Sequence, residues 1–270
     1  MTSIDIPGRI GVIGAGIMGE ALISAMIKAG VKPEAITISE KREERAVELT
    51  DTYGVRVADL ESNVANSEVL LLVVKPQDMS SLLSGMKNLL RPTTLLISFA
   101  AGKRIEFISG LLGSGNPVIR VMPNTPTLVG EGMAAISIGS NVTPEQSQFV
   151  RDFLSATGRV VEVDESLQDA VTSVSGSGPA YFFYFVESMI KAGVDLGLSE
   201  ALATELTIQT IVGSAKLLST SEKSPTTLRE NVTSPNGTTA AAISAFSQSD
   251  LPGIVKKAMT AARDRSRELA

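Results

Sequence analysis

The sequence contains no cysteine, no histidine and no tryptophan. The lack of cysteine excludes a disulfide framework, so nothing in the composition points to secretion. The lack of both cysteine and histidine excludes the common zinc sites and the Ser-His and Cys-His nucleophilic pairs. We therefore expect no metal centre, and we expect any enzymatic chemistry to depend on an organic cofactor.

Aromatic residues and net charge are also scarce. Aromatics form 4% of the 270 residues and apolar residues form 43%, which predicts an aliphatic core of helices on a parallel sheet. A formal net charge of -5 gives no footprint for nucleic acid or an anionic membrane. The N-terminus lacks the regions of a signal peptide, and the longest apolar run, Val69 to Val74, is too short to span a bilayer. We expect a cytoplasmic protein that acts on a small molecule and binds neither nucleic acid nor membrane.

Short apolar runs alternate with helical segments up to about residue 164. This alternation indicates βαβ units and a mainly parallel sheet. The expected strands are 9–13, 35–39, 69–74, 94–98, 118–122, 133–138 and 160–163, and the expected helices are 15–30, 42–52 and 79–90. Beyond residue 164 only helices are expected, at 181–196, 199–218, 224–232, 239–246 and 252–269. The sequence therefore predicts an α/β domain over residues 1–164 and an all-α domain over residues 165–270.

A glycine motif, Gly14-Ala15-Gly16-Ile17-Met18-Gly19, follows the first expected strand and opens the first expected helix. Gly14 permits a tight turn, Gly16 lets the backbone approach a pyrophosphate, and Gly19 allows close packing of helix on strand. The helix N-terminus would offer free N–H groups to the phosphates. A glycine-rich turn in an ordinary βα unit is the alternative, but the context favours a Rossmann-type dinucleotide site.

Charged residues follow the second expected strand. Glu40 would hydrogen-bond an adenosine ribose and favour NADH, whereas Lys41 and Arg42 would pair with a 2′-phosphate and favour NADPH. Solvated charge at a helix start is a third interpretation. We favour NADPH and place Lys41 and Arg42 among the candidate cofactor contacts, with NADH left open.

Further segments follow other strands at the same expected edge of the sheet. They are Lys75-Pro76-Gln77, the small residues Ala100-Ala101-Gly102 after Phe99, and a loop around Asn124 that two prolines stiffen. The loop around Asn124 would form one wall of a flat-ring pocket, and Asn124 is a candidate cofactor contact. A solvated lysine and a rigid turn are the alternatives.

In the helical part, Ser175 to Tyr181 precedes an aromatic stripe that we interpret as core or dimer interface rather than a ligand site. The segment Thr233 to Thr239 opens an Ala-rich helix with more hydroxyl groups than one N-cap requires. Free N–H groups at that N-terminus predict a carboxylate site.

With these motifs, the chain resembles the pyrroline-5-carboxylate reductase family from about residue 8 to residue 268. The glycine loop is common to many enzymes, but three later segments together are specific: Arg120 to Pro126, Ser175 to Tyr181 and Thr233 to Thr239. The resemblance implies a Rossmann-type domain and an all-α dimerisation domain, assembled as a dimer or a pentamer of dimers. It implies NAD(P)H-dependent reduction of 1-pyrroline-5-carboxylate to L-proline.

The resemblance also implies roles for individual residues. Thr239 would hydrogen-bond the ring nitrogen and is the candidate catalytic residue. The loop of Ser234, Pro235, Asn236, Gly237 and Thr238 would hold the substrate carboxylate through its backbone N–H groups, and Pro235, which has no N–H, would only shape the loop. The cofactor would contact Ile13, Gly14, Ala15, Gly16, Ile17, Met18, Val73, Val74, Lys75, Pro76, Phe99, Ala100 and Ala101.

The chain departs from the family pattern at two positions. Asn236 stands where the family usually has the first of two glycines, and asparagine tolerates the left-handed backbone that such a position needs. Leu60 stands where many members have an asparagine that contacts the adenosine ribose.

Two other functions remain open on the sequence. A β-hydroxyacid dehydrogenase would place a catalytic lysine four residues after Gly178, where this chain has Phe182, and no lysine follows before Lys191. A non-catalytic dinucleotide sensor would need the glycine loop but not Ser234 to Thr239.

Overall fold

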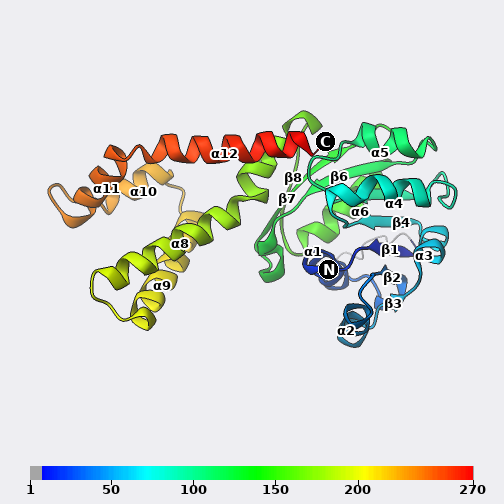
Figure 1. The fold of residues 1–270 in the computed structure, drawn as a ribbon, viewed down its shortest axis with the longest axis horizontal. Coiled ribbons are helices and arrows are strands. Elements are labelled where there is room, and N and C mark those ends of the chain that lie inside the picture. The colour runs from blue at the N-terminus through cyan, green and yellow to red at the C-terminus, as the bar shows by residue number, and fades with distance from the viewer. Residues whose placement is uncertain (1–7, 270) are drawn as a thin grey trace. The chain divides into compact units, whose positions relative to one another are not determined.

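A computed structural model describes residues 8–269 (Figure 1). The chain divides into two compact units. The sheet unit contains the chain up to Ser177 and again from Ala262, and the helical unit contains Gly178–Ala261.

The sheet unit is built on one eight-stranded sheet, as far as residues 8–269 show, in the order β3-β2-β1-β4-β5-β6-β7-β8. Neighbouring strands are parallel except β6 and β7, which pair antiparallel. The chain builds outward from β1 to β3 and then crosses back to β4, so the strand order reverses between β1 and β4. The strands are β1 (Ile10–Ile13), β2 (Ile36–Ser39), β3 (Arg56–Val57), β4 (Val69–Leu72), β5 (Leu95–Ser98), β6 (Val118–Met122), β7 (Gly132–Ile138) and β8 (Gly158–Glu162).

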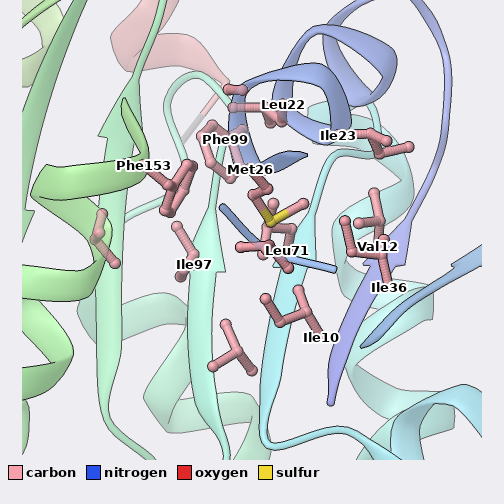
Figure 2. Close-up of a cluster of buried hydrophobic side chains, with 14 of the residues drawn as sticks. Ile10, Val12, Leu22, Ile23, Met26, Ile36, Leu71, Ile97, Phe99 and Phe153 are labelled. Atoms are coloured by element: carbon pink, nitrogen blue, oxygen red, sulfur yellow. The ribbon is translucent and has the colours of Figure 1, made fainter. Parts of the chain in front are cut away.

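Helices cover both faces of the sheet. Val12, Leu71 and Ile97 pack into a cluster with α1, α2 and α6 (Figure 2), whereas Leu70 and Leu72 pack on the opposite face with α3, α4 and α5. Successive residues of a strand face opposite sides, so the central strands must be apolar throughout. The helices are α1 (Ile17–Lys28), α2 (Glu43–Tyr53), α3 (Leu60–Asn66), α4 (Met79–Met86), α5 (Ile105–Leu112), α6 (Pro144–Ser155) and α7 (Gln168–Val171). Short 3-10 turns lie at Pro33–Ala35, Pro76–Asp78, Thr125–Val129 and Glu165–Leu167, and a π-helical turn lies at Thr172–Gly176.

This architecture confirms the predicted α/β fold class and every predicted strand, with small shifts at the ends. The sequence analysis did not predict β3, α3, α5, α6 or α7. Both residues of β3 are exposed, so this short edge strand has no apolar pattern. Helix α6 does have a sequence signal, because Thr143 and Gln146 form a reciprocal capping box at its start.

The compact units divide at a different place from the predicted boundary near residue 164. Helix α7 stays in the sheet unit because the buried Gln168 donates through Nε2 to the Ala135 carbonyl at 3.2 Å and to Ser137 Oγ at 2.9 Å. The chain also returns to the sheet unit from Ala262, which local sequence patterns do not predict.

The helical unit confirms the predicted run of helices. Its elements are α8 (Gly178–Asp195), α9 (Glu200–Thr220), α10 (Pro225–Asn231), α11 (Thr238–Gln248) and the first part of α12 (Leu251–Glu268). Helices α8 and α9 pack against each other, and the rings of Phe185 and Phe246 lie 6.3 Å apart. Of the residues Gly178–Ala261, only Ala203 and Thr207 are buried in the single chain.

Within residues 8–269, no helix combines the length and the apolar character needed to cross a bilayer.

Candidate active site

The carboxyl ends of β1, β2, β4, β5 and β6 lie level with one another. Ile13 is in register with Ser39 and with Leu72, Leu72 is in register with Ser98, and Ser98 is in register with Arg120. The segments that follow these strands therefore leave the sheet at one edge. This edge collects the predicted cofactor residues: Ile13 to Met18 after β1, Lys41 and Arg42 after β2, Val73 to Pro76 after β4, Phe99 to Ala101 after β5, and Asn124 after β6.

The glycine loop lies between β1 and β4, where the strand order reverses. In open parallel sheets, ligands bind outside the carboxyl ends of the strands at this position. Helix α1 begins there with Gly16 as its N-cap and no side-chain cap. The N–H groups of its first turn and its positive dipole end are thus available to an anion.

The glycines of the loop fit their predicted roles. Gly14 has φ 87°. A Cβ on Gly14 would lie 2.6 Å from the carbonyl oxygen of Val73, and a Cβ on Gly19 would lie 2.5 Å from the carbonyl oxygen of Gly14. At both positions the backbone packs so closely that only glycine fits. A Cβ on Gly16 would meet nothing within 4 Å, so open space lies beside the helix N-terminus at this residue.

Glu40 connects β2 to the glycine loop. Its Oε2 accepts a hydrogen bond from Ala15 N at 2.9 Å, and its Oε1 accepts from Arg42 Nε at 3.1 Å. Burial raises the pKa of the Glu40 carboxyl, but hydrogen bonds from Arg42 and then Ala15 outweigh that effect and hold it below its ordinary value. Glu40 is therefore an anion at the edge where the adenosine ribose is expected, paired with Arg42, one of the two cations that favour NADPH.

One predicted cofactor contact, Asn124, has another partner in the structure. The Asn124 side chain is buried, and its Oδ1 accepts from Met133 N at 2.8 Å, so it ties the stiff loop after β6 to β7. Lys75 is exposed and precedes the 3-10 turn that begins at Pro76. Leu60, at the start of α3, packs against the hydrophobic cluster of that face.

The sequence analysis missed a buried ionic group beside the same edge. Arg120 is 3% exposed, and its guanidinium lies 3.3 Å from Glu165 Oε1 and 3.9 Å from Asp169 Oδ1. Burial lowers the pKa of Arg120, while the two carboxylates act in the opposite direction. Arg120 is part of a motif that the sequence analysis singled out, but its partners lie far away in sequence and give no local signal.

The predicted carboxylate loop forms a tight turn in the helical unit. Asn236 has φ 60°, which confirms the left-handed backbone expected at this position. Gly237 donates its N–H to the Ser234 carbonyl at 3.0 Å and is the N-cap of α11, without a side-chain cap. No hydroxyl group of this segment caps α11, and the Thr233 hydroxyl donates instead to the Arg229 carbonyl in α10 at 2.6 Å. The N–H groups of Thr238 and Thr239 are at the start of the helix, as an anion site requires.

The structure thus assembles two groups of candidate residues. One lies at the carboxyl edge of the sheet, and the other lies at the N-terminus of α11 in the helical unit. The sheet order, the glycine loop and the uncapped α1 define a Rossmann-type dinucleotide-binding protein that continues into a helical C-terminal part.

Comparison with known proteins shows which family the chain belongs to. The family model for pyrroline-5-carboxylate reductase dimerisation matches residues 165–269, and the model for NADP oxidoreductase, coenzyme F420-dependent, matches residues 9–102. The pyrroline-5-carboxylate reductase of Corynebacterium melassecola is 42% identical over 264 residues, which are 96% of this chain and 98% of that protein. That of Pseudomonas aeruginosa is 40% identical, with 97% of each chain covered.

Solved structures agree. A pyrroline-5-carboxylate reductase from Coxiella burnetii superposes with a TM-score of 0.88 at 32% identity, over 98% of this chain and 99% of that one. The Plasmodium falciparum pyrroline carboxylate reductase with NADP bound also gives 0.88 at 32% identity, over 97% of each chain. The chain belongs to the pyrroline-5-carboxylate reductase family.

Likeness to a β-hydroxyacid dehydrogenase is confined to the fold. A Mycobacterium tuberculosis 3-hydroxyisobutyrate dehydrogenase gives a TM-score of 0.52 at 15% identity, over 72% of this chain and 67% of that one. On helix α8, the position expected for a catalytic lysine holds Phe182, and Lys191 lies more than two turns further along.

Proposed function

We propose that this protein reduces 1-pyrroline-5-carboxylate to L-proline with NADPH as the reductant, the last step of proline biosynthesis. The observation that carries the proposal is the combination of an uncapped glycine loop at the reversal of the sheet with an uncapped, hydroxyl-rich start of α11. The relatives named above, two of them about 40% identical over nearly the whole chain, support it.

The residues at the sheet edge fit a dinucleotide. The open space at Gly16 and the first turn of α1 suit a pyrophosphate, and the backbone after β4 and β5 suits the nicotinamide half. Ile13 to Met18, Val73 to Pro76 and Phe99 to Ala101 would hold the cofactor, with Lys41 and Arg42 toward a 2′-phosphate. When bound, NADPH supplies the hydride that reduces the C=N carbon of the substrate. NADH remains a second reductant because Glu40 offers a partner for a free ribose hydroxyl.

The start of α11 would hold the substrate. Thr238 and Thr239 present backbone N–H groups to the carboxylate, and the left-handed Asn236 shapes the loop beside them. The Thr239 hydroxyl would hydrogen-bond the ring nitrogen and orient the ring. Hydride addition to the carbon of a protonated C=N bond gives a secondary amine, and the proton on nitrogen can come from solvent before binding. The chain then needs no strong protein acid, as expected for a sequence without histidine or cysteine.

The contribution of the residues to the rate would be proximity and orientation. Holding two reactants in a productive geometry lowers a barrier by up to about 7–11 kcal/mol. Backbone N–H groups suit this role because the helix fixes their directions.

We infer self-association through the helical unit. Phe183 is 62% exposed and Tyr184 is 71% exposed on α8 of the single chain, and such a surface is typical of an interface. The dimerisation model matches the same region. We also propose assembly up to a pentamer of dimers, a cytoplasmic location, and no nucleic-acid or membrane partner. Light scattering of the purified protein measures the assembly.

The test is a substrate panel under one set of conditions. Loss of reduced nicotinamide absorbance is followed with pyrroline-5-carboxylate and with 2-keto acids, and gain of that absorbance is followed with 3-hydroxy acids plus oxidised cofactor. The proposal predicts turnover with pyrroline-5-carboxylate alone. Turnover with a 3-hydroxy acid would support the dehydrogenase alternative, and cofactor binding without any turnover would support the sensor alternative.

A further inference from the structure

The last turn of the chain packs directly on the turn that follows β5. Gly102, at the end of Phe99 to Gly102, has φ 76°, and a Cβ there would lie 2.6 Å from the carbonyl oxygen of Ser266 and 2.9 Å from Leu269 Cβ. Ser266 and Leu269 belong to the part of the chain that returns to the sheet unit after Ala262. The turn and the chain end therefore touch through their backbones, and only glycine leaves room for this contact.

A buried hydrogen bond holds the chain end in that place. Ser266 Oγ donates to Asp169 Oδ1 at 2.7 Å, and both residues are buried. Arg267 Nε lies 3.9 Å from the other oxygen of Asp169. Asp169 is on α7, 97 residues away in sequence, so this hydrogen bond fixes the end of α12 on the sheet unit.

The Asp169 carboxylate is also connected, through Arg120 and Glu165, to the other end of the turn after β5. Arg120 lies between Asp169 Oδ1, at 3.9 Å, and Glu165 Oε1, at 3.3 Å. Glu165 Oε1 also accepts from Ile105 N at 2.7 Å, at the first residue of α5. The turn is thus held at Gly102 by the chain end and at Ile105 by Glu165, and Arg120 and Asp169 connect the two contacts.

These groups depend on one another. Arg120 is almost fully buried, and a buried cation needs nearby carboxylates. Removal of the Asp169 charge would leave Arg120 with one carboxylate partner and Ser266 with a weaker acceptor. The turn after β5 would then lose the contact at Gly102 that limits its motion, while the glycine loop and α11 would keep their own contacts.

We propose that Asp169 and Ser266 are positioning residues for the cofactor: they fix the chain end against Gly102 and so hold Phe99 to Ala101 where the nicotinamide half of the cofactor binds. This proposal rests on the proposed function, because that function places the cofactor on Phe99 to Ala101. Neither residue touches the reacting atoms in this account.

The test compares two variants with two matched controls. Asp169→Asn removes the carboxylate charge and weakens the buried hydrogen bond, and Ser266→Ala removes that hydrogen bond. Asp264→Asn and Arg265→Ala change a half-buried and an exposed side chain on the same final turns of α12, where Asp264 pairs with Arg263 and Arg267 and Arg265 pairs with Glu268. Steady-state kinetics give the two KM values and kcat, and calorimetry gives the Kd for NADP+. We expect the KM for NADPH and the Kd for NADP+ to rise about five- to tenfold in the two variants, a typical size for coupling between distant groups. The KM for pyrroline-5-carboxylate should stay near the wild-type value, and the controls should match wild type.

A second measurement separates positioning from a general loss of structure. Hydrogen exchange of the peptide 99–106 should speed up in Asp169→Asn and Ser266→Ala, while exchange in α1 stays unchanged. Ser266→Thr keeps the hydroxyl group and should restore the KM for NADPH. Unchanged cofactor constants in Ser266→Ala, or equal rises in both KM values together with faster exchange throughout the sheet unit, would overturn the proposal.

The outcome is independent of the proposed reaction. If the wild-type protein fails to reduce pyrroline-5-carboxylate, the proposed function fails. Calorimetry with NADP+ still tests the positioning role, since weaker binding by Asp169→Asn than by Asp264→Asn supports it and equal binding overturns it.

Discussion

The carboxylate of Glu40 accepts a hydrogen bond from the backbone N–H of Ala15 at 2.9 Å. This contact ties the end of β2 to the glycine loop at the edge where the cofactor is proposed to bind. It also places a negative charge where the 2′-position of an adenosine ribose is expected, beside Arg42. Glu40 thus bears on both the choice of cofactor and the stability of the loop.

Replacement of Glu40 should change cofactor preference. A carboxylate repels a 2′-phosphate but accepts a hydrogen bond from a free ribose hydroxyl, so Glu40→Gln removes a charge that disfavours NADPH. The ratio of kcat/KM for NADPH to that for NADH should rise roughly tenfold, which corresponds to about 1.4 kcal/mol. Glu43→Gln, at the exposed first turn of α2, is the control and should leave the ratio unchanged. A ratio that stays constant or falls in Glu40→Gln would contradict this role.

The same residue predicts a pH dependence of stability. Burial raises the pKa of Glu40, and the hydrogen bonds from Arg42 and Ala15 lower it further than burial raises it. A group with a lowered folded pKa stabilises the fold above its unfolded pKa, and this contribution is lost as pH falls through the folded value. The difference in unfolding free energy between wild type and Glu40→Gln should therefore be largest near neutral pH and shrink below the ordinary glutamate range. Urea unfolding at a series of pH values measures it, and a difference independent of pH would exclude this contribution.

Alanine at two glycines of the same loop should affect different properties, stability at Gly19 and cofactor binding at Gly16. Gly19→Ala places a Cβ 2.5 Å from the Gly14 carbonyl oxygen, and such overpacking costs about 1–3 kcal/mol of stability. Gly16→Ala meets nothing within 4 Å, so the fold should tolerate it while the new methyl group occupies the space proposed for the pyrophosphate. Thermal unfolding and NADP+ calorimetry on both variants check this. Normal NADP+ affinity in Gly16→Ala would show that the pyrophosphate binds elsewhere.

Much of this site could be predicted from the sequence because its signals are local. Gly14, Gly16 and Gly19 have a spacing that belongs to one turn, and Asn236 stands in a motif that needs a left-handed residue. The carboxyl ends of parallel strands share one edge, so short motifs far apart in sequence could be placed together before the structure was known.

Other parts could not be predicted because they depend on contacts between distant segments. Asp169 and Ser266 are 97 residues apart, and nothing near either one indicates a partner. Asn124 has a polar side chain of the kind that contacts ligands, but its Oδ1 accepts a hydrogen bond from Met133 N. The helical unit has few buried residues in the single chain. Helix periodicity in the sequence therefore does not show what stabilises this unit.

The role of Thr239 is tested by removal of one hydroxyl group. Thr239→Ala should lower kcat by about tenfold or more, since a hydrogen bond to a charged group contributes roughly 1.5–3 kcal/mol. The Kd for NADP+ should not change, because the cofactor is proposed to bind on the sheet edge. Thr239→Ser keeps the hydroxyl group and should retain most activity, and Ser244→Ala lies further along α11 and serves as the control. Near-wild-type kinetics in Thr239→Ala would show that Thr239 has no role in the active site.

A crystal structure of the complete oligomer with NADP+ and L-proline tests the account most directly. The account predicts the diphosphate at Gly14 to Met18, the proline carboxylate on the backbone N–H groups at Thr238 and Thr239, and the reduced carbon facing the nicotinamide ring. Proline bound away from the start of α11, or a nicotinamide ring too distant from it for hydride transfer, would contradict the proposed reaction.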